Sequence, residues 1–254
     1  MPLLNLNELS WVEAKEYFRS NDVVLVPVGS NEQHGPHNPL GTDHLIALRF
    51  AEEASRRTGA ICLPVVPFGV SVHHRQFWGT VFVRPGVFKA YMRDLCLSLK
   101  SYGVHKIVVV NGHGGNTQSL RELARELREL GMFLSVFVWW AASKRSLPDL
   151  FSAKERRHAS AEETSVNLAL HPHLVHIEKA VDEKPRRLFP KASRGIFLGL
   201  DTADYSDSGV LGISTTASTE KGKKVFEAVV TELVRHVEAL RERKIDELLP
   251  KSLR

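Results

Sequence analysis

The sequence predicts an α/β fold in which a mostly parallel sheet is covered by helices on both faces. Short apolar segments alternate along the chain with longer amphipathic stretches, which is the pattern of consecutive β–α–β units. Residues 23–28 (VVLVPV) contain no polar side chain, as expected of a strand that is buried on both faces of a parallel sheet. Folds of this class bind ligands at the carboxyl ends of their strands, and three clusters of polar residues follow predicted strands here.

In the first half of the chain, capping and turn residues delimit the predicted elements. Ser10 and Glu13 fit a capping box, and Thr42 can cap the helix that follows it. Gly59 is a natural helix stop. The predicted elements are helices at 11–19, 43–57 and 85–102 and strands at 23–28, 61–66 and 80–83.

In the second half, the helical spacing of apolar residues gives the clearest boundaries. Asn116 can cap one helix, and Thr219 begins a long terminal helix with a continuous apolar stripe. The predicted elements are strands at 106–110, 133–140 and 210–213 and helices at 117–131, 161–170 and 219–240. Because no internal repeat or linker divides the chain, we expect a single domain over residues 1–254.

The composition is that of an ordinary globular protein and limits the expected partners. The net charge is +5, but Lys and Arg are interleaved with Glu and no nucleic-acid-binding motif accompanies them, so we expect no nucleic-acid partner. No apolar run approaches the roughly 20 residues of a membrane span, and the N-terminus does not resemble a signal peptide. Cys62 and Cys96 lack CxxC spacing and are interpreted as reduced core residues of a cytoplasmic protein.

The first polar cluster follows the strand at 23–28. Glu32 and His34 are two residues apart, so in an extended segment their side chains project to the same side. Asp43 returns to this region after a loop rich in Gly and Pro, in the first turn of a helix whose dipole favours the ionised carboxylate. Carboxylate and imidazole ligands suit Zn, Mn or Fe, and a carboxylate can bridge two ions. The alternative is a helix cap with a surface Glu and His.

The second and third clusters are NGHGGN at 111–116 and HASAEETS at 158–165. The glycines of the second permit a sharp turn that exposes His113 as a metal ligand, with a phosphate-binding turn as the alternative. The third places two acids about one helical turn from His158, although surface acids in a first helical turn are an equally simple explanation. A fourth region at 69–80 contains two adjacent histidines and could shape a substrate pocket.

Three of these segments, in this order, resemble the creatininase family of metal-dependent amidohydrolases. The resemblance rests on GSNEQHGPHNPLGTD, NGHGGN and HASAEETS and runs from about residue 23 to residue 213. It implies a three-layer α/β/α sandwich with a mostly parallel central sheet and a dinuclear metal site. It also implies a homo-oligomer, commonly a hexamer.

Carried over residue by residue, the resemblance implies two divalent ions per chain, Zn, Mn or Fe. Glu32 and His113 would bind one ion. His34 would bind the other ion, and Asp43 would bridge the two. His158 matches the family histidine that is placed for proton transfer.

One position departs from the family pattern. Creatininase itself has a glutamate ligand two residues after the histidine matched by His113, and the residue here is Gly115. We hypothesise that Glu163 supplies the missing ligand. The departure weakens the assignment of creatinine as substrate, because the same resemblance covers formamide-cleaving enzymes acting on a ribosylaminopyrimidine phosphate and a peptidase that trims a redox-cofactor precursor.

The expected function is therefore that of a hydrolase acting on a carbon–nitrogen bond other than a peptide bond, in a small cyclic amide or a formamide. A hydroxide activated by two metal ions would attack the carbonyl carbon, and His158 would protonate the departing nitrogen. A deformylase acting on a formamidopyrimidine nucleotide is the alternative, and an arginine of the basic segment 184–194 would favour it by holding a phosphate. A non-catalytic binding protein that retains the fold is the remaining possibility.

Overall fold

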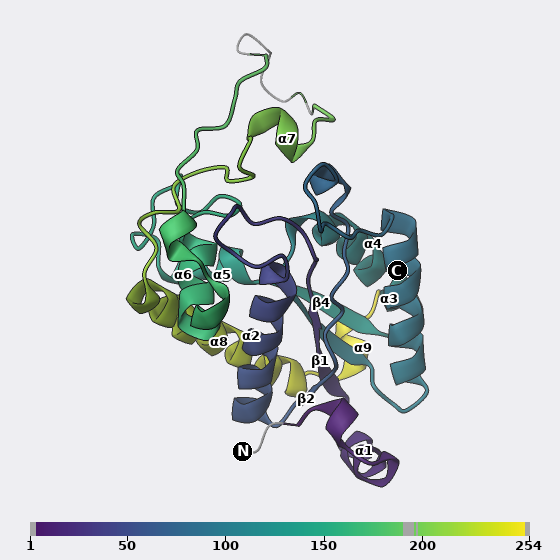
Figure 1. Ribbon diagram of the computed structural model, residues 1–254. Coiled ribbons are helices and arrows are strands. Elements are labelled where there is room, and N and C mark those ends of the chain that lie inside the picture. The colour runs from purple at the N-terminus through teal and green to yellow at the C-terminus, as the bar shows by residue number, and fades with distance from the viewer. Residues whose placement is uncertain (1–3, 190–195, 197, 252–254) are drawn as a thin grey trace.

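The computed structural model describes residues 4–189, 196 and 198–251, and a four-stranded parallel sheet lies at its centre (Figure 1). The strand order is β2-β1-β3-β4, and Lys106 of β3 lies opposite both Val23 of β1 and Phe133 of β4. The strands are β1 (Val23–Val28), β2 (Ile61–Cys62), β3 (Lys106–Asn111) and β4 (Phe133–Val138). The helices are α1 (Trp11–Phe18), α2 (Thr42–Thr58), α3 (Pro85–Lys100), α4 (Thr117–Glu129), α5 (Trp139–Ser146), α6 (Ala161–Leu170), α7 (Thr202–Tyr205), α8 (Thr219–Arg241) and α9 (Ile245–Leu248).

Helices cover both faces of the sheet, so the predicted three-layer arrangement is confirmed (Figure 1). Side chains alternate along each strand, and the two faces of β1 therefore enter different cores. Leu25 packs in a core with residues of α2, α6 and α8. Val24 packs in the opposite core with residues of α3 and α4. In the described part of the chain, no helix combines the length and the apolar character needed to cross a bilayer.

Four predicted strands end early or do not join the sheet. Prolines follow Cys62 closely and remove backbone donors, so β2 is only two residues long and Val66 forms an isolated bridge. β4 ends at Val138 because the chain turns directly into α5. The segment 80–83 contributes one antiparallel bridge at Val81. The segment 210–213 is not a strand, and its backbone N–H groups donate to carbonyls of the loop at 154–158.

The predicted caps give a mixed result. Ser10 and Glu13 form the expected capping box, and Gly59 ends α2 in the left-handed conformation. Thr42 is not a cap but the first residue of α2, and its hydroxyl donates to the carbonyl of Pro39. The Asn116 side chain accepts from the Val70 N–H and donates to the Gly29 carbonyl, so it joins two neighbouring loops instead of capping α4.

The N-terminus of α2 lies against the carboxyl ends of the two central strands. A Cβ atom at Gly29, after β1, would lie 2.3 Å from the backbone nitrogen of His44. A Cβ atom at Gly112, after β3, would lie 2.1 Å from the carbonyl oxygen of Asp43. Glycine at both positions therefore allows the close approach that places Asp43 between the loops following β1 and β3.

Candidate metal centre

The predicted site residues meet at the edge of a cavity of about 690 Å³ at the carboxyl ends of the strands. They come from the loop after β1, the start of α2, the turn after β3, and the turn that leads into α6. The cavity lining includes Glu32, Asp43, His113, His158 and Glu163. His34 lies behind these residues and is fully buried.

The first group of donor atoms consists of Glu32, Asp43 and His113. His113 Nδ1 lies 3.1 Å from Glu32 Oε2 and 3.0 Å from Asp43 Oδ2. The other ring nitrogen lies 2.9 Å from the Val70 carbonyl, which can only accept, so Nε2 carries the proton of the neutral ring. The lone pair of Nδ1 is thereby directed at the two carboxylates, as in a metal-binding histidine with an outer hydrogen-bond partner.

The second group consists of His34, Asp43 and Glu163. His34 Nε2 lies 3.1 Å from Asp43 Oδ1 and 3.9 Å from Glu163 Oε2. His34 Nδ1 lies 3.1 Å from the Glu32 carbonyl and donates to it, which leaves Nε2 as the coordinating nitrogen. Asp43 thus presents Oδ2 to the first group and Oδ1 to the second, the arrangement of a bridging carboxylate.

The donor set fits two divalent ions. Among the described residues, Glu32 Oε2, His34 Nε2 and Asp43 Oδ2 are buried atoms without a hydrogen-bond partner. Leaving three such atoms unsatisfied is costly unless a ligand occupies the space that they face. Mixed carboxylate and imidazole donors suit Zn, Mn or Fe.

The carboxylates create a strongly negative potential where the two groups meet. Burial alone would lower the pKa of His34, but Asp43, Glu163 and Glu32 raise it to about 9. Burial alone would likewise raise the pKa of Asp43, and the neighbouring His34 and His113 hold it well below its usual range. The pKa of Glu163 is raised to about 7, chiefly by burial.

Position 115 has no room for a side chain. A Cβ atom at Gly115 would lie 2.1 Å from the Val70 carbonyl oxygen and 2.5 Å from His113 Nε2, the two groups that form the hydrogen bond described above. Glu163 instead reaches the second group from the first turn of α6. Its Oε2 atom also accepts a hydrogen bond of 2.6 Å from the backbone N–H of Ala159.

His158 lies between the two donor groups and the cavity. Its ring centroid is 4.5 Å from that of His34 and 4.5 Å from that of His74. Nε2 lies 3.0 Å from the Gln33 backbone carbonyl and 2.8 Å from the Gln33 side-chain nitrogen, and Nδ1 lies 3.9 Å from Glu32 Oε1. Burial, with the charge of His34, holds the pKa of His158 well below its usual value.

The backbone of the third sequence motif turns sharply between His158 and Glu163. Ala159 has a φ of 54°, a left-handed conformation that is uncommon for a residue other than glycine, and it turns the chain between His158 and α6. The neighbouring acid, Glu162, points away from both donor groups and accepts hydrogen bonds from Ser143 and Arg156.

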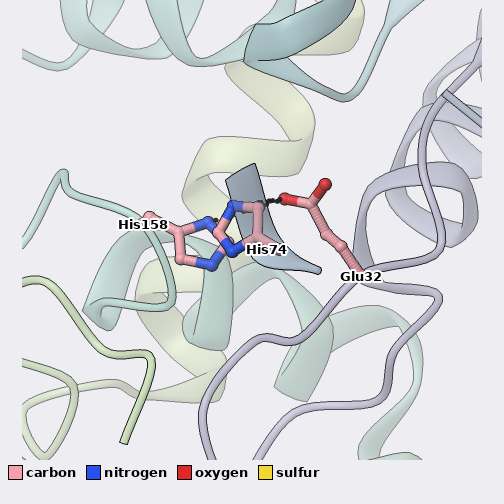
Figure 2. Close-up of side chains that lie close together, drawn as sticks. All are labelled: Glu32, His74 and His158. Carbon is pink, nitrogen blue, oxygen red and sulfur yellow. Dashed lines mark ion pairs between the residues drawn. The ribbon is translucent and has the colours of Figure 1, made fainter. Parts of the chain in front are cut away.

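The sequence analysis did not assign His74 to the site. His74 is only 2% exposed, and its Nε2 atom lies 3.3 Å from Glu32 Oε1 (Figure 2). Its neighbour His73 also lines the cavity and stacks on His113 with ring centroids 5.7 Å apart. The available signal was the position of both histidines in a loop beyond β2, at the same edge of the sheet as the other ligands.

The basic segment 184–194 does not supply the cavity with a free arginine among the described residues. Arg186 donates to Asp207 and to the carbonyls of Ala203 and Asp204. Lys184 and Arg187 are exposed and are not among the lining residues; Lys191 and Arg194 lie outside the described residues. The cavity is bordered by residues 199–202 of the same long loop, and Arg75 holds Asp201 at 2.7 Å.

Comparison with known proteins relates the whole chain to one family. The creatininase family model, described as creatinine amidohydrolase, matches residues 7–237. A mycofactocin precursor peptide peptidase from Mycobacterium ulcerans is 32% identical over 226 residues, which are 84% of each chain. The creatinine amidohydrolase of Pseudomonas putida is 29% identical over 244 residues, covering 89% of this chain and 92% of that protein.

Solved structures give the same relationship. A crystal structure of creatinine amidohydrolase superposes with a TM-score of 0.80 at 27% identity and covers 96% of this chain and 100% of its own. Other solved creatininases with comparable scores include a Zn-Zn type and an Mn form. A methanogen deformylase for a formylamino-ribosylaminopyrimidinone monophosphate, from Methanothermobacter marburgensis, is similar over only 37% of this chain.

Proposed function

The chain belongs to the creatininase family of amidohydrolases, and from this premise we propose that it hydrolyses a carbon–nitrogen bond of a cyclic amide or a formamide at a centre that holds two divalent ions. The observation that carries the proposal is the position of Asp43. Its Oδ2 atom lies 3.0 Å from His113 Nδ1, within the group that includes Glu32, and its Oδ1 atom lies 3.1 Å from His34 Nε2, which Glu163 also approaches.

The residues of the centre have distinct roles in the proposed reaction. Zn, Mn or Fe ions bound by the two groups would polarise the substrate carbonyl and lower the pKa of an attacking water. Glu32, Asp43 and His113 would hold one ion, and Asp43 would share the other with His34 and Glu163. His158 would transfer a proton to the departing nitrogen, and its Nδ1 atom lies 3.9 Å from Glu32 Oε1.

The cavity restricts the substrate to a compact molecule with apolar surface. Trp140, Leu200 and Leu211 are among the lining residues. Arg156 is paired with Glu162, and the other lining arginine, Arg157, has an exposed side chain. This lining supports a neutral or weakly charged amide better than a nucleotide with a phosphate.

A second candidate is a peptide bond near the end of a short peptide. The similarity to the mycofactocin precursor peptidase over 84% of each chain favours it. A nucleotide deformylase has weaker support, because that similarity is partial and Arg186 is bonded within its own loop.

A substrate screen with metal-loaded protein tests the proposal. Protein depleted of metal is reconstituted with Mn, Zn or Fe, and hydrolysis is measured for creatinine, other small cyclic amides, formamides, a formamidopyrimidine nucleotide and short peptides. We expect two ions per chain and turnover of a cyclic amide or formamide, and no turnover in an Asp43→Asn control. Exclusive cleavage of a peptide would select the second candidate, and failure to take up any metal would favour a binding protein.

We also propose that the protein is cytoplasmic, as its two unpaired core cysteines suggest, and that it is a homo-oligomer, as the family resemblance implies. Light scattering of the purified chain should give a mass near six copies. A monomeric mass at working concentrations would contradict the hexamer without affecting the metal centre.

A further inference from the structure

The orientation of the Gln33 side-chain amide is determined by two backbone groups. Its Oε1 atom accepts a hydrogen bond of 2.9 Å from the N–H of Gly35. Its Nε2 atom donates to the carbonyl of Gly209 at 3.2 Å. Because an N–H can only donate and a carbonyl can only accept, turning the amide over would replace both hydrogen bonds with repulsive contacts.

Gly209 makes this arrangement possible. Its φ is 84°, a conformation that favours glycine, and a Cβ atom there would lie 1.8 Å from Gln33 Oε1. The close approach of the Gly209 backbone therefore fixes which way round the Gln33 side-chain amide lies, with its nitrogen toward the Gly209 carbonyl.

The donor side of Gln33 determines the tautomer of His74. Gln33 Nε2 lies 2.9 Å from His74 Nδ1 and 2.8 Å from His158 Nε2. An amide nitrogen cannot accept, so His74 Nδ1 faces a donor and is the acceptor. The neutral ring must then carry its proton on Nε2. That nitrogen is the one that lies 3.3 Å from Glu32 Oε1, as Figure 2 shows.

The same tautomer argues against an additional ion held by His74. Donor atoms of Glu32, His74 and His158 lie within 4.8 Å of one another, which is close enough for an ion. A coordinating nitrogen must be free of its proton, however, and His74 Nε2 carries one as long as the Gln33 amide keeps its two backbone partners.

We propose that His74 is a positioning residue that directs its Nε2–H to Oε1 of Glu32 and thereby holds Oε2 toward His113 and the first ion. This inference rests on the proposed two-ion centre. The contacts run from the Gly209 backbone through Gln33 and His74 to Glu32. The other carboxylate oxygen of Glu32, Oε2, is buried and has no hydrogen-bond partner among the described residues.

Titration calorimetry of metal-free protein with Mn²⁺ tests the role of His74. His74→Leu removes the donor, and His74→Gln keeps an N–H donor near the position of Nε2. We expect His74→Leu to bind two ions with one affinity lowered roughly 10- to 100-fold, and His74→Gln to recover most of that loss. His236→Leu is the matched control, because it removes a half-buried histidine that contacts Ser135 and does not line the cavity.

The possible outcomes separate this inference from the proposed function. Unchanged affinities in His74→Leu would overturn the positioning role while leaving the two-ion centre intact. Loss of a whole ion at saturating Mn²⁺, without recovery in His74→Gln, would make His74 a ligand and also overturn it. Equal weakening of both ions, again without recovery, would indicate a general packing defect and reject the proposal. Wild-type protein that binds no Mn²⁺ would reject the proposed function and this inference with it.

Discussion

Glu163 is the residue on which the composition of the second ion site depends. Its carboxylate approaches His34 from α6, and the backbone around Gly115 has no room for the glutamate that the resemblance to creatininase would place there. In the proposed centre, replacing Glu163 would remove one of the two carboxylates that approach His34.

We therefore predict that Glu163→Ala lowers the metal content from two ions to about one per chain, as measured by mass spectrometry of the metals after dialysis. Glu162→Gln is the matched control, since the neighbouring carboxylate faces Ser143 and Arg156 instead of the ions. Two ions retained in Glu163→Ala would remove Glu163 from the ligand set.

For His158 we predict a catalytic effect without loss of metal. His158→Ala should lower kcat by roughly 10²–10⁴-fold, the usual contribution of a general acid or base. Metal content should stay at the wild-type value. His176→Ala, which removes an exposed histidine beside Glu178, should leave the rate unchanged, and full activity in His158→Ala would exclude it from proton transfer.

Among larger elements, the long loop that precedes α7 is joined to the segment after it by several hydrogen bonds, four of which end on the carboxylate of Glu183. Glu183 accepts hydrogen bonds from the backbone N–H groups of Asp207 and Ser208 and from the hydroxyls of Ser206 and Ser208. Burial alone would raise the pKa of Glu183, but these hydrogen bonds lower it to about 2. The loop that borders the cavity at 199–202 lies between the two segments joined in this way.

The sign of the pH dependence follows from the lowered pKa of Glu183. A carboxyl that is harder to protonate in the folded state stabilises the fold above its unfolded pKa near 4.5, and this contribution is lost as the pH falls from there toward 2. We predict that Glu183→Gln speeds amide hydrogen exchange at 206–209 roughly tenfold at pH 7. The exposed Glu178→Gln is the control, and unchanged exchange in Glu183→Gln would show that the serines hold the loop without the carboxylate.

The regular elements could be predicted from the sequence where one periodic pattern spans the whole element. β1 and α6, which are largely buried, and the amphipathic α4 and α8 follow the expected boundaries closely. The edges of the sheet could not be predicted in the same way. Whether 210–213 joins the sheet depends on hydrogen bonds to 154–158, which local propensity does not contain.

The main residues of the candidate site could be predicted from the sequence, but the contacts of His74 could not. The predicted residues Glu32, His34, Asp43 and His113 meet because each follows a central strand or begins α2, and the family and the hydrolase class were inferred correctly from the three motifs. His74 was not predictable, since a histidine in an irregular loop has no defined partner until the fold is known. Its tautomer depends on Gln33 and Gly209, which are 176 residues apart in the chain.

For the molecule as a whole, the proposed ions link function to stability. The carboxylates of Glu32, Asp43 and Glu163 lie close together at the carboxyl end of the sheet. Without the ions, their mutual repulsion would destabilise the folded state. Ligands that bind only the folded state stabilise it by about 4 kcal/mol at a concentration of 1,000 Kd.

We predict that a strong chelator lowers the Tm by on the order of 10 °C, since about 1 kcal/mol corresponds to roughly 2–4 °C in a chain of this size. Differential scanning fluorimetry with and without Mn²⁺ measures the shift. Asp43→Asn, which weakens both proposed sites, should show almost no response to chelator. A wild-type Tm that is independent of chelator would contradict bound structural ions.

The absence of a side chain at Gly115 has a consequence for regulation. If Glu163 replaces a ligand on the turn after β3, one ion ligand and the proton-transfer residue His158 are only five positions apart, joined by the hydrogen bond from Ala159 to Glu163. α6 is in turn fixed to α8, where Gly222 allows the Ser165 carbonyl to approach closely. The affinity of the second site for its ion and the proton affinity of His158 are then reciprocally linked. Loss of the ion changes the free energy of protonation of His158 by the same amount as protonation of His158 changes the free energy of ion binding. A ligand that shifts α6 changes both affinities together.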